Sequence, residues 1–215
     1  ITIASFNNKS VIDIGANCGT FTRYALANGA NRVISVEPNS TAFQYLSDTF
    51  GKEQNVTLIN AAMSDKNGEE KLYSSKFNNT MCSMLENHMP SQDAFIETVK
   101  SIPLKDLIDN IQIDKIDILK IDIEGYEYKV LDTLPDSYFD KIDTFIIEVH
   151  FVLEKKEELF KLLARLKKLN YELDFFENNG VPINNIYSVD KEMGLVIAKK
   201  KHHIETNKLK IIYFL

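Results

Sequence analysis

The sequence predicts an α/β fold built on a mostly parallel β-sheet. Short apolar runs alternate along the chain with segments whose apolar residues recur at helical spacing, which is typical of a parallel sheet covered by helices. The clearest example starts at Val11, where an apolar strand leads through a tight glycine turn into a helix that begins near Thr20. A second strand of this kind ends at the acidic residue Glu37.

Strands are expected in short apolar or β-branched runs that are bounded by turn residues. These runs cover residues 11–14, 32–37, 55–60, 116–122, 142–149, 171–176 and 193–199. The last two are expected to close the sheet as an antiparallel pair. Helices are expected at residues 19–28, from Ser40 onward, at 126–134 and at 154–169. Ser40 is expected to cap the second helix, and Gly29 to close the first.

The alternation breaks between Ala62 and Pro103, where an insertion is expected at about residues 63–103. Two short strands, at residues 70–74 and 98–102, flank a polar loop at about residues 75–92. The loop contains the three methionines Met81, Met84 and Met89. Its length fits a lid or binding loop, and a plain surface excursion is the alternative.

The composition limits the protein classes that need to be considered. A length of 215 residues and a hydrophobic content of 44% fit one globular domain, expected at residues 1–200 with a C-terminal tail at 201–215. The net charge of −6 provides no overall basic field for nucleic acid or an anionic membrane. Neither a membrane-spanning run nor a signal peptide is recognisable, and Cys18 and Cys82 form no disulfide framework, so a cytoplasmic location is expected.

The glycine turn has the pattern D-x-G-x-x-x-G, formed by Asp13, Gly15 and Gly19. A dinucleotide site needs G-x-G-x-x-G, and here Asn17 takes the place of the middle glycine, which argues against a nicotinamide oxidoreductase. A carboxylate at the strand end repels phosphate but suits a ligand with an ammonium group and hydroxyls, such as S-adenosylmethionine (SAM). Glu37 lies where a carboxylate that binds both ribose hydroxyls is usual.

Five segments carry a family resemblance. In chain order they read DIGANCGTFT, VISVEPNS, NAAMSDKNGE, LKIDIEGYE and FIIEVH. Together they resemble the FkbM family of SAM-dependent methyltransferases, over roughly Val11 to His150 and more weakly to about Lys199. The resemblance implies a class I methyltransferase fold, with a seven-stranded, mostly parallel sheet, helices on both faces and a hairpin and loop insertion after the third strand. It also implies methyl transfer from SAM, chiefly to a hydroxyl of a sugar or another small molecule.

Residues of the turn and of the strand ends are the candidates for binding SAM. They are Asp13, Gly15, Ala16, Asn17, Gly19, Thr20, Glu37, Pro38, Ala61, Ala62 and Asp122. Asp13 is expected near the methionine amine, or as a cap of the following helix, or both. The Thr20 hydroxyl is a second candidate for capping that helix. Ala61 and Ala62, with Asn60, would face the adenine, and simple helix–sheet packing is the alternative.

Side chains alternate between faces along a strand, so Lys120, Asp122 and Glu124 are expected on one face, and Glu148 and His150 on one face of the neighbouring strand. Such charges form either a structural ion cluster or the lining of a wet pocket at the carboxyl edge of the sheet, where ligands of open α/β sheets bind. We favour the pocket. Asp122, Glu124 and His150 are then the candidate catalytic residues, with Glu124 or His150 as the base that deprotonates the hydroxyl.

Two further interpretations remain open. Asp122, Glu124, Glu148 and His150 offer oxygen and nitrogen ligands that could converge on Mg²⁺ or a similar ion, as in catechol-type methyltransferases. The family resemblance requires no metal, so no metal site is assigned. The chain could also be a non-catalytic SAM-binding or scaffold domain. A small-molecule or glycan acceptor is expected and nucleic acid is not, while the identity of the acceptor and the oligomeric state stay open.

Overall fold

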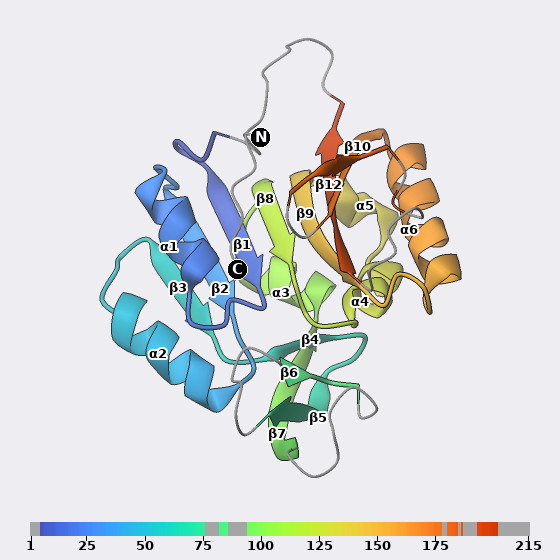
Figure 1. Cartoon of the computed structure of the whole chain (residues 1–215). Coiled ribbons are helices and arrows are strands. Elements are labelled where there is room, and N and C mark those ends of the chain that lie inside the picture. Colours follow the sequence, from blue (N-terminus) through green and yellow to red (C-terminus); the bar gives the residue numbers. More distant parts are fainter. Residues whose placement is uncertain are drawn as a thin grey trace.

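A large twisted sheet forms the centre of the computed structural model (Figure 1), which describes residues 5–75, 82–85, 94–177, 180–184, 186 and 193–201. Its strands run in the order β3-β2-β1-β8-β9-β12-β10-β11. The strands from β3 to β9 are parallel, and the remaining pairs are antiparallel. Their bounds are β1 Ser10–Ile14, β2 Arg32–Val36, β3 Val56–Ile59, β8 Ile116–Ile121, β9 Ile142–His150, β10 Tyr171–Glu177, β11 Pro182–Ile183 and β12 Met193–Lys200.

The predicted α/β fold is confirmed, and each of the seven expected strands lies within two residues of its predicted bounds. The antiparallel pairing of β10 with β12 is confirmed as well. The two-residue strand β11 adds an eighth strand at the edge next to β10. A strand of two residues has no periodicity, so the sequence pattern contains no signal for it.

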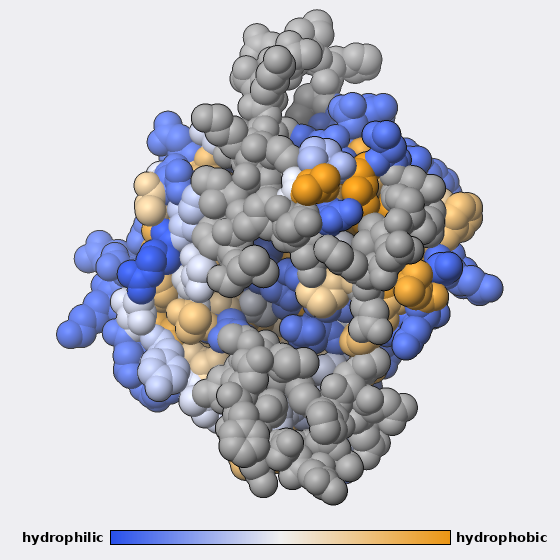
Figure 2. All heavy atoms as spheres, viewed as in Figure 1, coloured by the Kyte–Doolittle hydropathy of each residue, from blue (hydrophilic) through white to orange (hydrophobic). Residues whose placement is uncertain are grey.

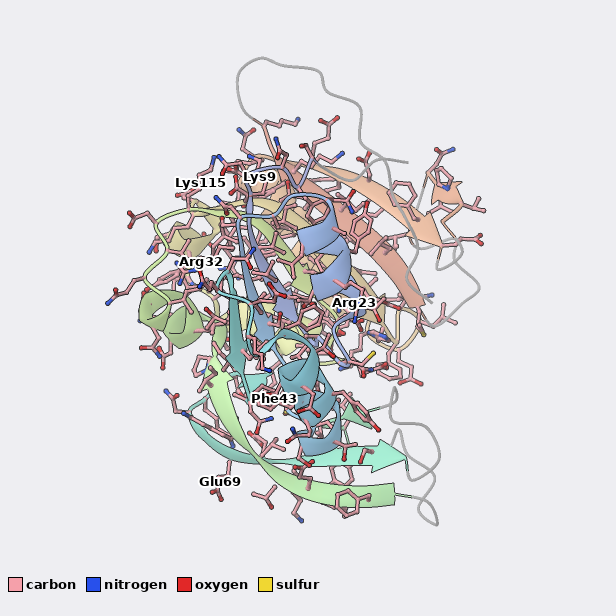
Figure 3. All side chains as sticks on the ribbon, turned by 90° about the vertical axis from the view of Figure 1, so that its left-hand side faces the viewer. Lys9, Arg23, Arg32, Phe43, Glu69 and Lys115 are labelled. Atoms are coloured by element: carbon pink, nitrogen blue, oxygen red, sulfur yellow. The ribbon has the colours of Figure 1, made fainter. Side chains whose placement is uncertain are left out.

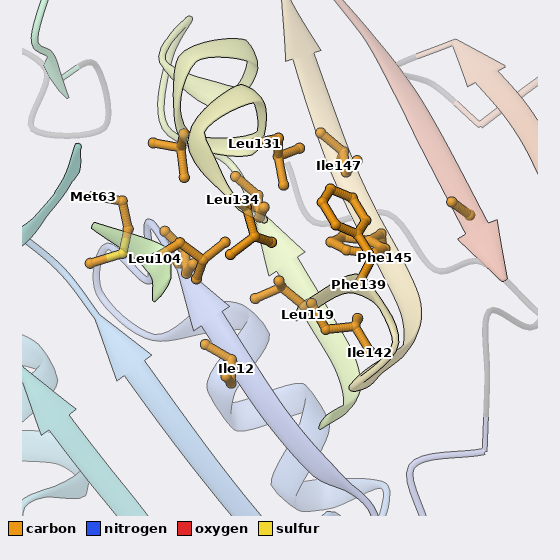
Figure 4. Close-up of a cluster of buried hydrophobic side chains, with 14 of the residues drawn as sticks. Ile12, Met63, Leu104, Leu119, Leu131, Leu134, Phe139, Ile142, Phe145 and Ile147 are labelled. Atoms are coloured by element: carbon orange, nitrogen blue, oxygen red, sulfur yellow. The ribbon is translucent and has the colours of Figure 1, made fainter. Parts of the chain in front are cut away.

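Helices cover both faces of the sheet. α1 (Thr20–Ala27) and α2 (Ser40–Phe50) pack on one face, where Val11, Val33 and Ile118 are buried. The other face is covered by α3 (Leu104–Asn110), α4 (Glu127–Thr133), α5 (Asp136–Phe139) and α6 (Lys156–Lys168). Figure 4 shows part of this second core, which includes Ile12 and Leu119 of the sheet, Leu131 of α4 and Leu134 directly after that helix. The alternation of side chains along each strand supplies both layers.

The predicted N-terminal caps are wrong for both helices, namely Asp13 or Thr20 for α1 and Ser40 for α2. Gly19 occupies the N-cap position of α1 in a left-handed conformation (φ 89°), and no side chain caps this helix. Thr20 is already the first helical residue, and its hydroxyl lies 3.6 Å from the Cys18 sulfur. At α2 the cap is Asn39 rather than Ser40, because the Asn39 side chain accepts a hydrogen bond of 2.9 Å from the Ala42 amide. Thr20 and Ser40 each lie one residue after the observed cap.

A second, four-stranded sheet forms the predicted insertion and lies at the carboxyl ends of the parallel strands (Figure 1). Its order is β4-β7-β5-β6, and β5 pairs antiparallel with β7. The bounds are β4 Ala62–Ser64, β5 Gly68–Ser75, β6 Cys82–Ser83 and β7 Ala94–Pro103. Met81 and Met89 of the expected lid lie outside the described residues, as does most of the expected tail, so both expectations stay predictions.

Ion pairs fix the opposite, amino-terminal ends of the strands. Lys9 lies 2.8 Å from Asp117, and Lys115 lies 2.6 Å from Asp143. Figure 3 shows Lys9 and Lys115 at this end and Glu69 on the small sheet at the other. These four charged side chains therefore form structural pairs, and we expect the functional site at the carboxyl ends of the strands.

The face in Figure 2 is mostly hydrophilic where described residues form it, with separate smaller hydrophobic areas. No helix in the described part of the chain is both long and apolar enough to cross a membrane.

Candidate active site

A pocket lies between the carboxyl edge of the large sheet and the small sheet. Predicted site residues in its lining are Gly15, Asn17, Glu37, Pro38, Ala61, Ala62, Asp122 and Glu124. Ile123 follows β8 in the same wall, and Met63, Leu72 and Met84 add apolar side chains from the insertion. The topology therefore brings the ends of β1, β2, β3 and β8 together around one space, as expected for an open α/β sheet.

Gly15 is required by the contact between two strand ends. It has a positive φ of 76°, and a Cβ atom placed on it would lie 1.7 Å from the carbonyl oxygen of Asp122. The Gly15 amide donates to the Val36 carbonyl, and the Asp122 amide donates to the Ile14 carbonyl. A side chain on residue 15 would thus collide with the end of β8, which explains why glycine is needed here.

Glu37 is held in the pocket wall by two backbone amides. Its Oε2 accepts a hydrogen bond from the Asn17 amide and its Oε1 accepts one from the Asn39 amide, both at 2.8 Å. Burial raises the pKa of the Glu37 carboxyl to about 7, although the two amides and the charge of Lys120 oppose the rise. Each carboxylate oxygen still has a second lone pair with which to accept a hydrogen bond from a ligand hydroxyl.

Asp13 lies behind the pocket rather than in its lining. It is fully buried, and it accepts a hydrogen bond of 2.8 Å from the Thr22 hydroxyl. Its other oxygen lies 3.5 Å from the Lys120 ammonium, which donates to the Gly15 carbonyl at 2.9 Å and lies 3.1 Å from Asp122. Burial lowers the pKa of Lys120, but the charges of Asp122 and Asp13 raise it more, so Lys120 stays charged. Asp13 and Lys120 thereby fix the glycine turn to the end of β8.

Some of the other residues predicted to bind the cofactor line the pocket, and others lie outside its lining. Ala61 and Ala62 are buried in the wall, where their small side chains leave room. Asn60 donates its side-chain amide to the carbonyls of Glu37 and Pro38, at 2.8 and 3.1 Å, so it fixes the end of β2. Three predicted residues stand outside the lining, at or beside the start of α1: Ala16, Gly19 and Thr20.

His150 lies at the end of β9 with only 2% of its surface exposed. Its Nδ1 lies 2.8 Å from Oε1 of the fully buried Glu127, and its Nε2 lies 3.4 Å from Oε2 of Glu124. Burial lowers the pKa of His150, but the hydrogen bond and charge of Glu127, with the charge of Glu124, raise it to about 10. An imidazolium has no lone pair with which to accept a proton, which argues against His150 as the base in this form.

The surroundings of Glu124 suit a proton acceptor better than those of His150. It lies in the pocket lining, and burial raises the pKa of its carboxyl. Its backbone is left-handed (φ 52°), and its carbonyl accepts a hydrogen bond of 2.8 Å from the Ser83 hydroxyl of β6. A desolvated carboxylate of raised pKa is a stronger proton acceptor than one in water.

Glu127 was given no role in the sequence analysis, although it ends the segment LKIDIEGYE. Its Oε1 also accepts hydrogen bonds from the amides of Ile123 and Gly125, at 3.1 Å each. A signal was present, because Glu127, Val130, Leu131 and Leu134 lie at the spacing of one helix face. A carboxylate at the start of a buried apolar stripe needs a partner, and that partner is His150.

The chain is similar to known proteins in both its sequence and its fold. The family model described as "Methyltransferase FkbM domain" matches residues 13–173. A hexuronic acid methyltransferase of Haloferax volcanii is 24% identical over 170 residues, covering 76% of this chain and 67% of the relative.

Solved structures show the same fold. A methyltransferase FkbM from Methylobacillus flagellatus has a TM-score of 0.55 at 14% identity, covering 91% of this chain and 44% of that one. A methyltransferase from Streptococcus mutans, solved in complex with SAH, has a TM-score of 0.54 at 13% identity, covering 91% and 90%.

Proposed function

Because the chain belongs to the FkbM methyltransferase family, we propose that it transfers a methyl group from SAM to a hydroxyl oxygen of a sugar or another small molecule. The observation that carries this proposal is the composition of the pocket. Carboxylates that follow β2 and β8 line one space together with small apolar residues that follow β3.

The lining offers complementary groups for the parts of SAM. Glu37 presents fixed carboxylate oxygens to the ribose hydroxyls, and Ala61 and Ala62 leave an apolar space for the adenine. Asp122 adds negative charge beside the glycine turn, which suits the ammonium and sulfonium groups. When bound, SAM supplies an electrophilic methyl group on a positively charged sulfur.

Glu124 is proposed as the base that accepts the proton of the acceptor hydroxyl. A hydroxyl must lose its proton as its oxygen attacks, and a positioned base contributes typically ~10²–10⁴-fold in rate. The carbonyl of Glu124 is fixed by Ser83, and its side chain is oriented beside His150. Further acceleration comes from holding the two reactants in line.

A sugar is the acceptor that we favour. The named activity of the Haloferax volcanii relative concerns a hexuronic acid, and the family resemblance points to hydroxyl acceptors. The acidic residues at the pocket edge also suit hydroxyl groups, which donate hydrogen bonds to Asp122 and Glu124.

The test begins with calorimetric titration of SAM and of NAD into the protein, where we expect binding of SAM alone. Formation of SAH is then measured with neutral hexoses, hexuronic acids, a secondary-metabolite alcohol and a short RNA. We expect turnover with a sugar, and the product should resist mild alkali because a methyl ether, unlike a methyl ester, is not saponified. An alkali-labile product would contradict the hydroxyl acceptor, and failure to bind SAM would contradict the function itself.

A further inference from the structure

Three side chains with metal-ligating atoms meet at the edge of the pocket. One ligand atom from each of Asp122, Glu148 and His150 lies within 4.8 Å of the other two. Asp122 follows β8, while Glu148 and His150 lie two residues apart on the same face of β9. Two carboxylates and one imidazole form a donor set that Mn²⁺, Fe²⁺ or Zn²⁺ accepts, whereas Mg²⁺ and Ca²⁺ favour oxygen ligands alone.

The imidazole of His150 also points to a ligand at this place. Its side chain is almost completely buried, and its Nε2 has no hydrogen-bond partner among the residues described. The contact of 3.4 Å from Nε2 to Glu124 is an ion pair only when the imidazole is protonated. A buried nitrogen with no hydrogen-bond partner is costly, and it is directed here toward two carboxylates.

The other nitrogen of His150 is arranged as in metal-binding histidines. Nδ1 lies 2.8 Å from Glu127, and the same carboxylate oxygen is fixed by the amides of Ile123 and Gly125. Metal-ligating histidines almost always donate their second N–H to a carboxylate or a carbonyl, which sets the tautomer and the ring orientation. With Nδ1–H donating to Glu127, the lone pair of Nε2 faces the cluster.

We propose that Asp122, Glu148 and His150 bind one divalent transition-metal ion at the edge of the pocket. The ion takes the place of a proton on Nε2, and that proton leaves to the solvent. In an octahedral site with ligands 2.0–2.1 Å from the ion, neighbouring ligand atoms lie ~3 Å apart and opposite ones ~4.2 Å apart. The three ligand atoms here lie within 4.8 Å of one another, so they need to move inward only slightly. The carboxylates provide the negative charge that balances the ion.

Three protein ligands leave coordination positions open toward the pocket, which Asp122 also lines. Two oxygens of a vicinal diol, or of a hydroxy acid, fit such positions. An acceptor hydroxyl bound there has its pKa lowered by the ion, so Glu124 removes its proton more easily. This role of the ion rests on the proposed methyl transfer, whereas the ion site itself does not.

The test uses protein freed of metal by a chelator and then titrated with Mn²⁺, without SAM or acceptor. Calorimetry and electron paramagnetic resonance are expected to show one bound ion per chain. Asp122→Asn and Glu148→Gln should each weaken binding at least tenfold, because a neutral amide replaces a charged carboxylate ligand. Both side chains are only half-buried and the substitutions keep their size, so the variants are expected to fold. Glu172→Gln, on the exposed face of β10, should bind Mn²⁺ within twofold of the parent.

The outcome separates the two proposals. Absence of Mn²⁺ binding at millimolar concentration, or equal binding by both ligand variants and the parent, overturns the metal site and leaves an ion cluster with a protonated His150. SAM affinity is measured on the same chelated protein. If SAM binds while Mn²⁺ does not, the metal site fails and the methyl transfer proposal stands. If Mn²⁺ binds while SAM does not, the proposed function fails instead.

Discussion

Oε1 of Glu127 lies 2.8 Å from Nδ1 of His150, and both side chains are buried. The pair joins the first turn of α4 to the last residue of β9. It determines which way the imidazole faces, because Nε2 is left pointing toward Glu124 and the acidic cluster. Burial by itself lowers the pKa of His150, and the charges of Glu127 and Glu124 raise it to about 10.

Glu127→Gln is expected to change how the stability of the chelated protein depends on pH. The folded pKa of His150, about 10, lies above its ordinary value of 6.5, so its stabilising effect is complete below pH 6.5 and is lost as the pH rises toward 10. The introduced amide lacks the charge that raises this pKa, so the loss should be smaller in the variant. Urea unfolding at pH 7, 8, 9 and 10 measures it. If the free energy of unfolding depends on pH in the same way in the variant and the parent, Glu127 does not hold the proton on His150.

Glu37→Ala is expected to weaken SAM binding by roughly 1–3 kcal/mol, because it removes a charged acceptor from the ribose hydroxyls. Calorimetry measures the affinity, and Glu69→Ala, at an exposed position of the small sheet, is the matched control. Equal SAM affinity in the Glu37 variant and the parent would remove the ribose assignment.

The SAM affinity of the parent should also rise with pH. Burial raises the pKa of Glu37 to about 7, so the carboxylate form that accepts two hydroxyls becomes dominant only above neutral pH. We therefore expect tighter binding at pH 8 than at pH 6, and a flatter profile in Glu37→Ala. The same raised pKa means that the folded state binds the proton of Glu37 more tightly than the unfolded state does. The metal-free, ligand-free protein should therefore lose stability as the pH rises from 4.5 to 7.

Gly15→Ala should both destabilise the protein and reduce SAM binding, because the new Cβ would lie 1.7 Å from the Asp122 carbonyl. The positive φ alone costs roughly 1–2 kcal/mol. Gly68→Ala is the matched control, since Gly68 also has a positive φ (146°) but no atom within 4 Å of the added Cβ. Thermal unfolding should show a clearly larger loss for the Gly15 variant. Similar losses in both variants would mean that the collision is relieved without cost.

The sequence predicted the large sheet well, because apolar strands such as residues 116–121 are separated by clear turns and helices. It also placed Asp122, which follows β8, and His150, which ends β9, at the carboxyl edge, where their side chains lie close together. It could not place Met63 or Leu72 in the pocket, because they belong to an insertion whose position depends on tertiary contacts. It also missed α3, a helix of only two turns directly after β7.

Asp13 shows a second limit of sequence reasoning. An acid at the end of a strand can face a ligand or the protein interior, and the pattern is the same for both. In the structure its two oxygens face Thr22 and Lys120, both within the protein. Its assignment to the methionine amine remains a prediction, and direct contact would need the side chain to leave its buried position.

Glu124→Gln should lower kcat strongly, by ~10²–10⁴-fold, while SAM affinity stays within a few-fold of the parent. The amide keeps the size of the side chain but accepts no proton. Turnover and calorimetric SAM binding are measured on the same preparation. Undiminished turnover would place the base elsewhere or leave the proton to solvent.

Ser83→Ala tests whether the insertion helps to hold the base. The Ser83 hydroxyl is buried, donates to the Glu124 carbonyl at 2.8 Å and accepts from the Leu85 amide at 3.1 Å. Without the Ser83 hydroxyl, the left-handed backbone of Glu124 loses a hydrogen bond that holds it. The Glu124 carboxylate should then spend less time in the position where it can accept the proton. We expect kcat to fall about tenfold, equivalent to ~1.4 kcal/mol, with little change in SAM affinity.

Ser74→Ala is the matched control, because Ser74 is a buried serine of the same sheet whose hydroxyl donates to the Phe95 carbonyl within that sheet. It should lower stability without a comparable fall in kcat. Rescue of turnover by Ser83→Thr, which keeps the hydroxyl, would support positioning over general destabilisation. Equal kcat in Ser83→Ala and the parent would show that β6 holds the segment after β8 without influencing the chemistry.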